Sequence, residues 1–359
     1  LAFEPVAREL ENFAQLFESI TWIASRHPYN ATIRNVKKIE KIQLKYILTP
    51  VVGGIGLLNR FKIIAEYFRL GLLIIINIFQ YDVVHTRGPS HAAIIAAFYS
   101  RFFRKKIFWQ KYAGNWGAKK NPVSYAVNKR LLKSCRRSIV TINGHWPDQP
   151  QHCLSFENPC LTNSERQSGS ETQQKKSYDG KLDLIFVGRV EEEKGVGRIL
   201  TAYNELKGHS RLGILRIVGD GPSRIKYEKM AEELNIYAEF HGLLNRMELN
   251  KLFSLSHVLL LPSSASEGFP KVIAEGANYG CIPVVSDISS LPQYILNNIN
   301  GFITPSQDAE GLKFCIQNLM SMNGHDLKNM ALKAHEMGSK FTFEYYNYRI
   351  SVDILGLPK

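Results

Sequence analysis

The chain has 359 residues, of which 45% are hydrophobic and 21% are charged. This composition is typical of a globular protein with enough residues for two domains, and it excludes wholesale disorder, collagen and coiled coil. The five cysteines form no CxxC pair and no even set, so we expect a reducing compartment rather than a scaffold stapled by disulfides.

Positive charge is concentrated in the first half of the chain. Residues 1–179 hold 26 Lys and Arg against 12 Asp and Glu, whereas residues 180–359 hold 19 against 20. A surplus confined to one half indicates contact with an anionic partner such as a lipid headgroup surface, an acidic polymer or nucleic acid. A solvated basic surface without a partner is the alternative. The sequence resembles no RNA-binding motif and offers no aromatic stacking platform, so we expect no nucleic acid partner.

The first half begins with a helical pattern over residues 6–17. Apolar spacing at Phe61, Ile64, Ala65 and Phe68 then continues into the run 72–79, which is too short to span a bilayer and is expected to cover a sheet. Strands are expected at 19–24, 42–46, 82–85, 107–110 and 138–141. Because a doubly wound domain normally opens with a strand, we expect this domain to lack its first strand and the loop after it.

The second half follows a segment rich in Ser, Gln, Lys and Glu over residues 163–181, which we interpret as a polar linker. Short β-rich runs then alternate with amphipathic segments, which predicts an α/β fold with a parallel sheet. The runs are 184–187, 215–218, 238–241, 258–261 and 282–285. We therefore predict two Rossmann-like doubly wound domains facing a cleft, residues 1–162 and 182–340, with 341–359 as a C-terminal helix that crosses back to the first.

Two glycine turns end strands in the second half. Gly188-Arg189 is followed by Lys194-Gly195 and a helix, so free N–H groups and two cations converge on a plausible anion site. A surface turn whose cations pair with Glu191–Glu193 is the alternative. The turn at residues 218–222, Val-Gly-Asp-Gly-Pro, by itself indicates only a tight turn.

The segment 259–276 carries a sharper pattern. An apolar strand runs into a small-residue loop, and Pro270 stands where the first position of a helix is expected. Glu267 precedes this helix and Glu275 lies two turns inside it, about 8 to 12 Å away. That separation suits two hydroxyl-bearing parts of one extended ligand. The alternative is a capping Glu267 and a Glu275 paired with Lys271.

These motifs together resemble the carboxyl-terminal half of retaining glycosyltransferases of family 4, which have the GT-B fold. Their order and spacing match over about residues 182–305, and the pair Glu267 and Glu275 is the family's hallmark. The matching segments are Gly188-Arg189 to Lys194-Gly195, residues 218–222, Phe240-His241-Gly242, Pro262-Ser263 to Glu275, and Gly280 to Val285.

The resemblance implies a nucleoside diphosphate sugar as donor and transfer of its sugar with retention of configuration, without a metal or other cofactor. Catalysis would fall to Arg189 and Lys194, which hold the diphosphate, and Glu267, which holds the hexose hydroxyls. Glu275 would hold the ribose, and the amides of Gly268 and Phe269 would face the sugar. Gly188, Gly219, Gly242, Leu243 and Pro270 complete the donor-binding set. The sequence has no DxD triplet and no metal-spaced His/Cys cluster, in agreement with this implication.

The first half departs from the family, because the region where many members carry a histidine reads Lys111-Tyr112-Ala113-Gly114-Asn115-Trp116. The remaining acceptor-side candidates are His85, Arg87, Asn115 and His145. For both histidines, a satisfied structural role is the alternative.

We expect a cytoplasmic enzyme, peripheral on the inner face of the membrane. It would move a hexose from a UDP- or GDP-sugar to a cell-surface glycan or its lipid-linked precursor. Its basic half would lie against anionic membrane through two patches, Arg101, Arg104, Lys105 and Lys106, and the one-sided set Lys129, Arg130, Lys133, Arg136 and Arg137. The alternative function is a non-catalytic nucleotide-sugar or polyanion binder with a degenerate first domain.

Overall fold

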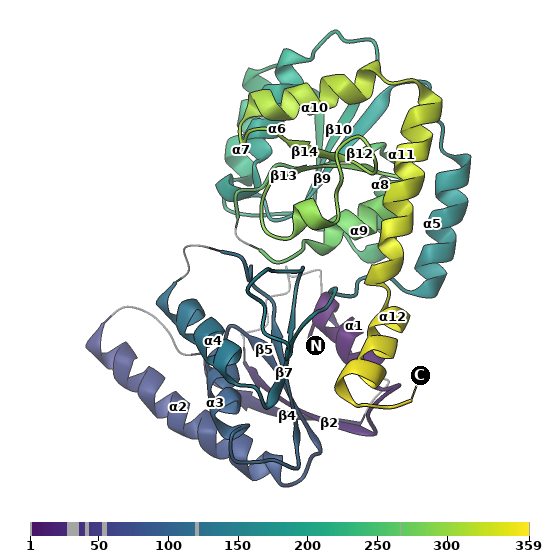
Figure 1. Ribbon diagram of the computed structural model, residues 1–359. Helices are drawn as coiled ribbons and strands as arrows, with labels where there is room; N and C mark the ends of the chain where they lie inside the picture. The colour runs from purple at the N-terminus through teal and green to yellow at the C-terminus, as the bar shows by residue number, and fades with distance from the viewer. Residues whose placement is uncertain are drawn as a thin grey trace. The chain divides into compact units, whose positions relative to one another are not determined.

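A computed structural model describes residues 2–26, 36–39, 43–51, 56–118, 122–265 and 267–358. The chain forms two compact units (Figure 1). Unit 1 comprises Leu1–Glu157 and Tyr346–Lys359, and unit 2 comprises Asn158–Tyr345. Expectations that fall on Leu1, Ile42, Ser266 and Lys359 lie outside the described residues.

Unit 2 is built on a six-stranded parallel sheet of order β11-β10-β9-β12-β13-β14. The central strands are apolar along nearly their whole length, as parallel strands covered on both faces must be. The strands are β9 (Leu182–Val187), β10 (Leu212–Val218), β11 (Ala238–Gly242), β12 (Val258–Leu261), β13 (Ile282–Ser286) and β14 (Phe302–Thr304). All five strands expected here are present, within a few residues.

Two groups of helices cover this sheet (Figure 1). One group is α6 (Val196–Glu205), α7 (Arg224–Glu233) and α10 (Ala309–Ser321). The other is α5 (Asn163–Lys175), α8 (Arg246–Leu255), α9 (Lys271–Asn278) and α11 (Gly324–Met337).

The segment expected to be a linker is the helix α5, so that expectation is wrong for residues 163–175. A capping box between Thr162 and Glu165 starts the helix. Polar contacts then hold it against α9, because Arg166 Nη1 donates to Asn278 Oδ1 at 2.8 Å and Asn278 Nδ2 donates to the Glu165 carbonyl at 2.8 Å. The helix packs through polar side chains and Gly169, so it lacks the apolar stripe by which helices are usually detected.

Unit 1 contains two separate parallel sheets. The first pairs β2 (Ser19–Ser25) with β4 (Gln43–Thr49), and the second has the order β5-β6-β7-β8. The strands of the second sheet are β5 (Val83–Gly88), β6 (Ile107–Tyr112), β7 (Ser138–Ile142) and β8 (Cys153–Ser155). A two-residue strand, β1 (Ala2–Phe3), pairs antiparallel with β3 (Val36–Lys37) and joins neither sheet. Within the described residues, the parallel sheets of this unit therefore begin with β2.

The helices of unit 1 are α1 (Glu4–Phe13), α2 (Leu57–Ile78), α3 (His91–Tyr99) and α4 (Val123–Ser134). The segment from Tyr346 also belongs to this unit. The helix α12 (Phe343–Arg349) continues directly into a π-helical turn, Ile350–Ile354. Ile350 and Ile354 of this turn pack in one core with Leu10 and Trp109.

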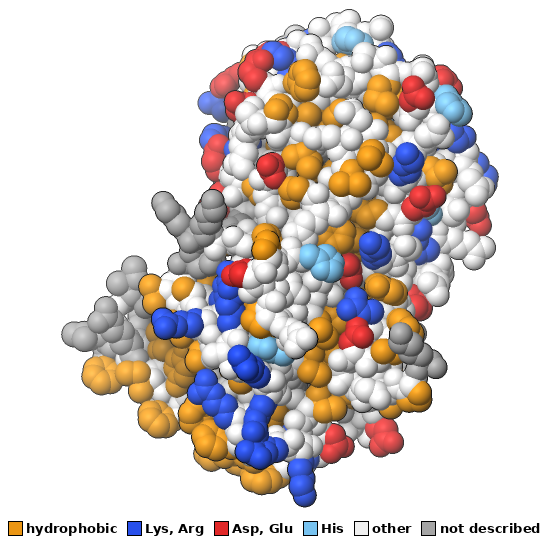
Figure 2. Space-filling model, in the orientation of Figure 1, with side chains coloured by type: hydrophobic (Ala, Val, Ile, Leu, Met, Phe, Trp, Pro, Cys, Tyr) orange, Lys and Arg blue, Asp and Glu red, His pale blue; other side chains and the backbone are white. Residues whose placement is uncertain are grey.

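The helix α2 is apolar on two faces. One face places Ile74 and Ile78 in a core with Phe108, as expected of a helix that covers a sheet. A second face is exposed to solvent and carries side chains spaced three or four residues apart. This exposed α2 face consists of Phe61, Ile64, Phe68, Leu72 and Ile76, with Phe79 just beyond the helix. Figure 2 shows hydrophobic side chains gathered along this edge of unit 1, beside a field of Lys and Arg.

The expectation of one helical face for the second basic patch is wrong. The helix α4 ends at Ser134, so Arg136 and Arg137 lie beyond it. Lys133 pairs with Asp148, and Lys129 donates to the Trp116 carbonyl. This patch is therefore partly engaged in contacts within unit 1.

Candidate donor-binding site

Three glycines bring the carboxyl ends of β9, β10 and β11 into main-chain contact. The Gly188 N–H donates to the Val218 carbonyl at 3.0 Å, and the Gly219 N–H donates to the Gly242 carbonyl at 2.8 Å. At Gly219, where φ is +126°, a Cβ atom would lie 1.9 Å from the Gly188 carbonyl oxygen. Only glycine fits there, so the turn at 218–222 also brings two strand ends together.

The turn after β9 positions Lys194. Gly195 has a φ of +86°, and a Cβ atom there would lie 2.4 Å from the Pro262 carbonyl oxygen, so this turn packs directly on the loop after β12. That loop carries Glu267, whose carboxylate forms an ion pair with the Lys194 ammonium. Lys194 is nearly buried, with 11% of its side chain exposed, whereas 42% of Glu267 is exposed. Two residues predicted to bind the donor are thus brought together, although 73 positions separate them.

Arg189 lies at the same strand end but points into solvent. Its side chain is 67% exposed, and its Nε is 3.1 Å from Glu191 Oε2. For Arg189, the alternative of pairing with a neighbouring glutamate is thus observed. Such an exposed pair contributes about 0 to 1 kcal/mol, so it holds the guanidinium only weakly.

Glu275 is buried in α9 and has a different partner from the one considered in the sequence. Its Oε1 lies 2.6 Å from Arg246 Nη1, so Lys271 is not its ion-pair partner. Arg246 Nε is also 3.0 Å from Glu165 Oε1, and its Nη2 donates to the Cys160 carbonyl. Burial acts to lower the pKa of Arg246, but the carboxylates of Glu275 and Glu165 outweigh this effect and raise it. Sequence reasoning missed Arg246, for which the only local signal was its place at the start of α8.

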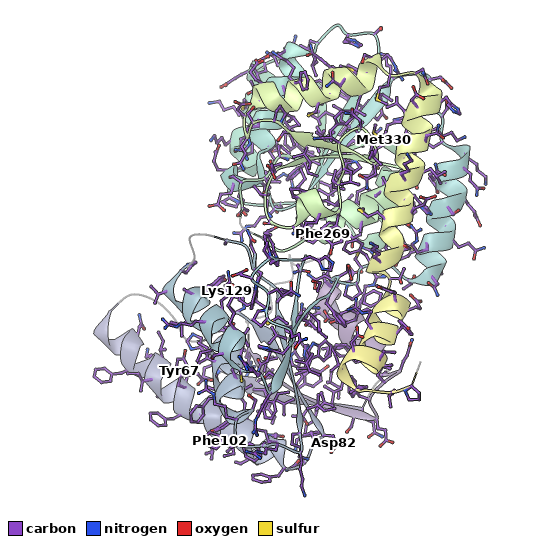
Figure 3. The ribbon with its side chains drawn as sticks, viewed as in Figure 1. Tyr67, Asp82, Phe102, Lys129, Phe269 and Met330 are labelled. Atoms are coloured by element: carbon purple, nitrogen blue, oxygen red, sulfur yellow. The ribbon has the colours of Figure 1, made fainter. Side chains whose placement is uncertain are left out.

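The loop between Glu267 and Glu275 is anchored by an aromatic stack. The Phe269 ring, whose residue is labelled in Figure 3, belongs to this loop. Its centroid lies 4.4 Å from that of the Phe341 ring and 4.9 Å from that of the Tyr294 ring. The Gly268 carbonyl accepts a hydrogen bond from Ser290 Oγ at 3.1 Å. Pro270 caps α9 from the position before its first residue, one place earlier than expected. The Phe269 side chain therefore fixes this loop, in which Gly268 is also buried.

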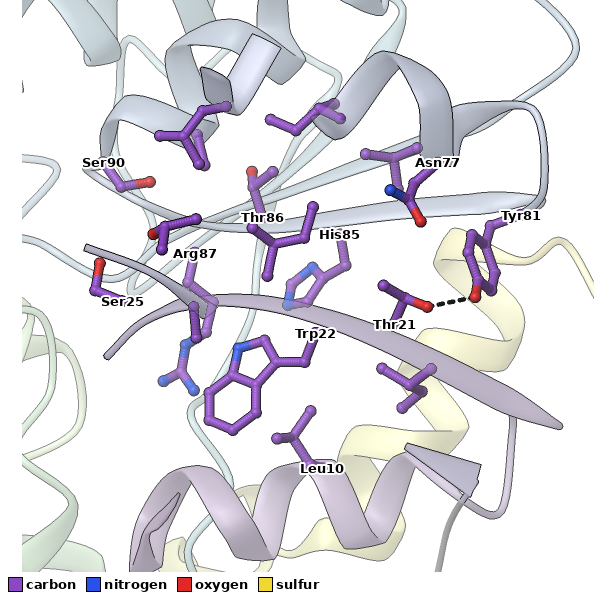
Figure 4. A pocket seen from close by; sticks show the side chains of 18 of the residues that line it. Leu10, Thr21, Trp22, Ser25, Asn77, Tyr81, His85, Thr86, Arg87 and Ser90 are labelled. Carbon is purple, nitrogen blue, oxygen red and sulfur yellow. Dashed lines mark hydrogen bonds between the residues drawn. The ribbon is translucent and has the colours of Figure 1, made fainter. Parts of the chain in front are cut away.

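In unit 1, His85 is packed among aromatic rings. Its ring lies 3.8 Å from that of Trp109 and 5.8 Å from that of Phe13, between centroids. Its Nδ1 is 3.2 Å from the Trp109 carbonyl oxygen, and burial lowers its pKa to about 3. His85 is therefore neutral at physiological pH. The alternative of a satisfied structural histidine holds only in part, because its Nε2 is buried without a hydrogen-bond partner among the described residues (Figure 4).

Arg87 is exposed but pairs with a buried cluster of Glu9, Lys111 and Tyr346, which sequence reasoning missed. Its Nη1 is 3.3 Å from Oε2 of Glu9, and Lys111 Nζ is 2.7 Å from Oε1 of the same carboxylate. Lys111 also donates to the Tyr346 hydroxyl at 3.1 Å, and burial raises the pKa of that phenol well above its usual value. The members come from α1, β5, β6 and α12, so no local pattern could have indicated the cluster.

The other two acceptor-side candidates lie in loops. Asn115 follows β6, and its Oδ1 accepts a hydrogen bond from the Gly117 N–H at 3.0 Å. His145 follows β7 and is exposed. Because β6 and β7 are parallel neighbours, both loops leave the same edge of the sheet.

The described ranges contain no group of three or more His, Cys, Asp or Glu side chains placed to hold a metal ion. Among the same residues, no helix combines the length and hydropathy needed to cross a membrane.

Residues 168–337 match the family model of glycosyl transferases group 1. The matched segment includes most of unit 2. The match contains Arg189, Lys194, Glu267 and Glu275, together with the three glycines at the strand ends. The site described in unit 2 therefore lies within the segment that matches the group 1 model.

Curated relatives include enzymes named for polysaccharide biosynthesis. A putative colanic acid biosynthesis glycosyltransferase, WcaL of Salmonella typhimurium, is 27% identical over 163 residues, which are 43% of this chain and 40% of that protein. The amylovoran biosynthesis glycosyltransferase AmsK of Erwinia amylovora is 25% identical over 181 residues, 48% of this chain and 44% of that protein. The alignments thus cover less than half the length of these relatives.

Solved structures resemble the chain over nearly its whole length. Anabaena Alr3699/HepE, crystallised with UDP and glucose, has a TM-score of 0.71 at 15% identity and covers 99% of this chain and 98% of that one. The sucrose-phosphate synthase of Thermosynechococcus elongatus has a TM-score of 0.68 at 15% identity, covering 96% and 90%. This likeness establishes the fold, which is the GT-B architecture of two Rossmann-like units.

Proposed function

We propose that this chain is a retaining glycosyltransferase that moves a hexose from a nucleoside diphosphate sugar to a glycan acceptor. The observation that carries the proposal is the ion pair of Lys194 with Glu267, at strand ends tied together by glycine contacts. The match of residues 168–337 to the group 1 family model supports it.

The chemistry requires a diphosphate to leave while positive charge develops on the sugar. Fixed cations beside the leaving group stabilise its charge, and we assign this role to Lys194 and Arg189. A bound diphosphate would compete with Glu267 for the Lys194 ammonium. Its binding would release the Glu267 carboxylate to accept hydrogen bonds from sugar hydroxyls, so the ion pair would couple the two parts of the donor.

Glu275 would hold the ribose hydroxyls. Arg246 fixes one oxygen of its carboxylate at 2.6 Å, which orients the group and leaves the second oxygen as an acceptor. The buried stack around Phe269 holds the intervening loop, so both carboxylates are presented from a rigid support.

Thermal unfolding in the presence of a ligand panel tests this assignment. The panel consists of UDP, GDP, UDP-glucose and GDP-mannose, with UDP and UDP-glucose first because HepE was crystallised with them. A ligand at 100 times its dissociation constant adds about 2.7 kcal/mol to the free energy of unfolding. We expect one nucleotide to raise the melting temperature of the parent chain and of Lys313→Ala, but not of Lys194→Ala.

Lys313 is a matched control, because it is a paired lysine on α10 that takes no part in the proposed site. Absence of any shift would favour the alternative of a non-catalytic protein. A shift without release of nucleoside diphosphate on addition of acceptor glycans would make the chain a nucleotide-sugar binder.

The acceptor that we propose is a cell-surface glycan or its lipid-linked precursor, in line with the names of WcaL and AmsK. The exposed α2 face supports a place at the inner surface of the membrane. Phe61 is 68% exposed and Phe68 78%, and a helix with such a face lies in the interface of a bilayer. Exposed cations near it would meet anionic headgroups, each worth about 1 kcal/mol. They are Lys62, Arg69, Arg101, Arg104 and Lys105.

Sedimentation with vesicles tests the membrane proposal. We expect the chain to bind vesicles that contain anionic lipid, and the double variant Phe61→Ser and Phe68→Ser to bind at least about tenfold more weakly. The double variant Ile225→Ser and Met247→Ser is the matched control, because both side chains are 80% exposed on unit 2. Equal binding by the two double variants, or binding indifferent to anionic lipid, would contradict the proposal.

A further inference from the structure

Arg198, in the first turn of α6, joins two segments of the proposed donor site. Its Nη2 donates to the Pro262 carbonyl at 2.7 Å and to the Glu193 carbonyl at 3.2 Å. Glu193 directly precedes Lys194, and Pro262 opens the loop that carries Glu267. A single nitrogen of Arg198 therefore bridges the turn after β9 and the loop after β12.

The Glu193 carbonyl oxygen is the point where the turn and the loop meet. The Ser264 N–H donates to it at 2.8 Å, and the hydroxyls of Ser264 and Ser263 lie 3.2 and 3.4 Å away. Arg198 donates to the same oxygen from α6, so the helix, the turn and the loop share one hydrogen-bonding centre. The position of this carbonyl also sets that of Lys194, the next residue in the chain.

The backbone of Gly195 makes room for the Arg198 guanidinium. A Cβ atom at Gly195 would lie 2.7 Å from Nη2 and 2.9 Å from Nε of Arg198. The guanidinium therefore lies directly against the residue that follows Lys194. The absence of a side chain at position 195 allows both this contact and the close approach of Pro262.

A cation at this place does not favour the fold by itself. The amino end of a helix carries partial positive charge, which favours acidic residues, and α6 has none in its first turn. The Arg198 Nε is buried and has no hydrogen-bond partner in the described part of the chain, which costs free energy. Residues that break such local rules are expected where the chain serves a function.

We propose that Arg198 is a positioning residue that holds the Lys194 turn in place when the diphosphate of the donor binds. This inference rests on the proposed function. In the ligand-free chain, the Lys194–Glu267 ion pair and the Arg198 bridge both join the turn to the loop. When the diphosphate takes the place of the Glu267 carboxylate, the ion pair opens and the Arg198 bridge remains. A cation fixed in advance stabilises the charge of its ligand without reorganisation, so loss of the bridge should weaken nucleotide binding more than folding.

Calorimetric titration with UDP and GDP tests this inference on the variant Arg198→Met, which keeps a long unbranched side chain and removes the donors. We expect the dissociation constant of the nucleotide that binds the parent chain to rise at least about tenfold, the effect of losing a charge-assisted hydrogen bond. Arg198→Lys, whose ammonium can still donate to a carbonyl, should lose less affinity.

Arg211→Met is the matched control. Arg211 also bridges main-chain carbonyls, donating to that of Met320 at 3.0 Å and that of Gly180 at 3.3 Å, but it precedes the amino end of β10, away from the strand ends of the proposed site. We expect this variant to bind nucleotide as the parent chain does, and Arg198→Met to lose no more stability in urea unfolding than Arg211→Met. Equal losses of affinity in the two variants, or a larger loss of stability in Arg198→Met, would make Arg198 a structural residue and overturn the inference.

Amide hydrogen exchange without nucleotide separates positioning from direct contact with phosphate. Because the Ser264 N–H donates to the carbonyl that Arg198 holds, this amide should exchange at least about tenfold faster in Arg198→Met than in the parent chain. Weaker nucleotide binding with unchanged exchange of Ser264 would assign Arg198 to the phosphates themselves and overturn the inference. Absence of binding by the parent chain would overturn the proposed function as well, whereas equal binding by the parent chain and Arg198→Met would overturn the inference alone.

Discussion

The Lys194–Glu267 ion pair joins two groups that face different parts of the proposed donor. In the absence of ligand, each charge neutralises the other, and a diphosphate has to displace the carboxylate. Loss of the carboxylate should therefore strengthen the binding of the nucleotide and weaken the binding of the sugar.

Glu267→Gln is therefore expected to separate the two functions. The unpaired Lys194 should bind the nucleoside diphosphate up to about fivefold more tightly, the gain available from a pair worth at most about 1 kcal/mol. Turnover of the donor should fall at least about 100-fold, because the acceptor for the sugar hydroxyls is lost. Calorimetric titration and a coupled assay measure the two effects, and parallel losses in both would show that Glu267 acts only by supporting the fold.

His85 gives unit 1 a pH dependence of known sign. Its folded pKa is about 3, below the ordinary value of 6.5, so the unfolded chain takes up a proton at a pH where the folded chain does not. Above pH 6.5, His85 is neutral in both the folded and the unfolded chain, and its contribution to the free energy of unfolding is constant. As the pH is lowered from 6.5 toward 3, this contribution falls, because only the unfolded chain takes up the proton. The slope is at most about 1.4 kcal/mol per pH unit.

The variant His85→Gln removes this titration. Urea unfolding between pH 4.5 and 7 should show a shallower loss of stability in the variant than in the parent, whatever its stability at neutral pH. Other buried histidines, such as His257 and His335, titrate in both chains and cancel in the comparison. Identical slopes would mean that His85 is protonated in the folded chain.

At the scale of elements, the contact between strand ends makes Gly219 irreplaceable. Gly219→Ala would place a methyl group 1.9 Å from the Gly188 carbonyl oxygen, in addition to the cost of a positive φ. Gly208→Ala is the matched control, because Gly208 has a φ of +85° but no atom within 4 Å of the added Cβ. The control isolates the backbone cost of about 1 to 2 kcal/mol.

We expect Gly219→Ala to lose clearly more stability than Gly208→Ala in urea unfolding, and to lose nucleotide affinity as well. Similar losses in the two variants would mean that the strand ends can separate without cost.

The sequence predicted the strands well because each is short, apolar and bounded by turn residues. Two predictions about helices were wrong. One helix packs through polar contacts, and the other ends earlier than expected. Residues 163–175 look like a linker because α5 packs through Arg166, Gly169 and Asn278 rather than through an apolar stripe. The second basic patch was extrapolated beyond Ser134, where α4 stops.

At the scale of the whole molecule, the two units carry different optical probes. All four tryptophans, Trp22, Trp109, Trp116 and Trp146, belong to unit 1, whereas the proposed nucleotide site belongs to unit 2. Each unit also has core clusters of its own. Tryptophan fluorescence therefore reports on one unit, and nucleotide binding acts on the other.

We expect the nucleotide to raise the midpoint of unfolding followed by far-UV circular dichroism and to leave the tryptophan fluorescence transition where it is. Lys194→Ala is the control in which neither signal should move. A fluorescence transition that moves as far as the dichroism would mean that the two units unfold as one cooperative body.

How much of the site the sequence can predict differs between the units for a physical reason. In unit 2 the proposed ligands follow strand ends, and parallel strands deliver their ends to one edge, so local motifs suffice. In unit 1 the cluster of Glu9, Arg87, Lys111 and Tyr346 forms only after distant segments have packed together. No spacing in the sequence relates Glu9 to a tyrosine that follows it by 337 positions.

The membership of Tyr346 and Ile350 in the core of unit 1 also dictates an order of events on the ribosome. Domains usually fold in the order of their synthesis, the first one to emerge folding first. Here the polypeptide of unit 2 is contiguous and can collapse while the core around Leu10 and Trp109 still waits for residues translated later. During translation, the first part to leave the tunnel is thus the last that can close, and its exposed apolar surface makes it the natural client of a chaperone.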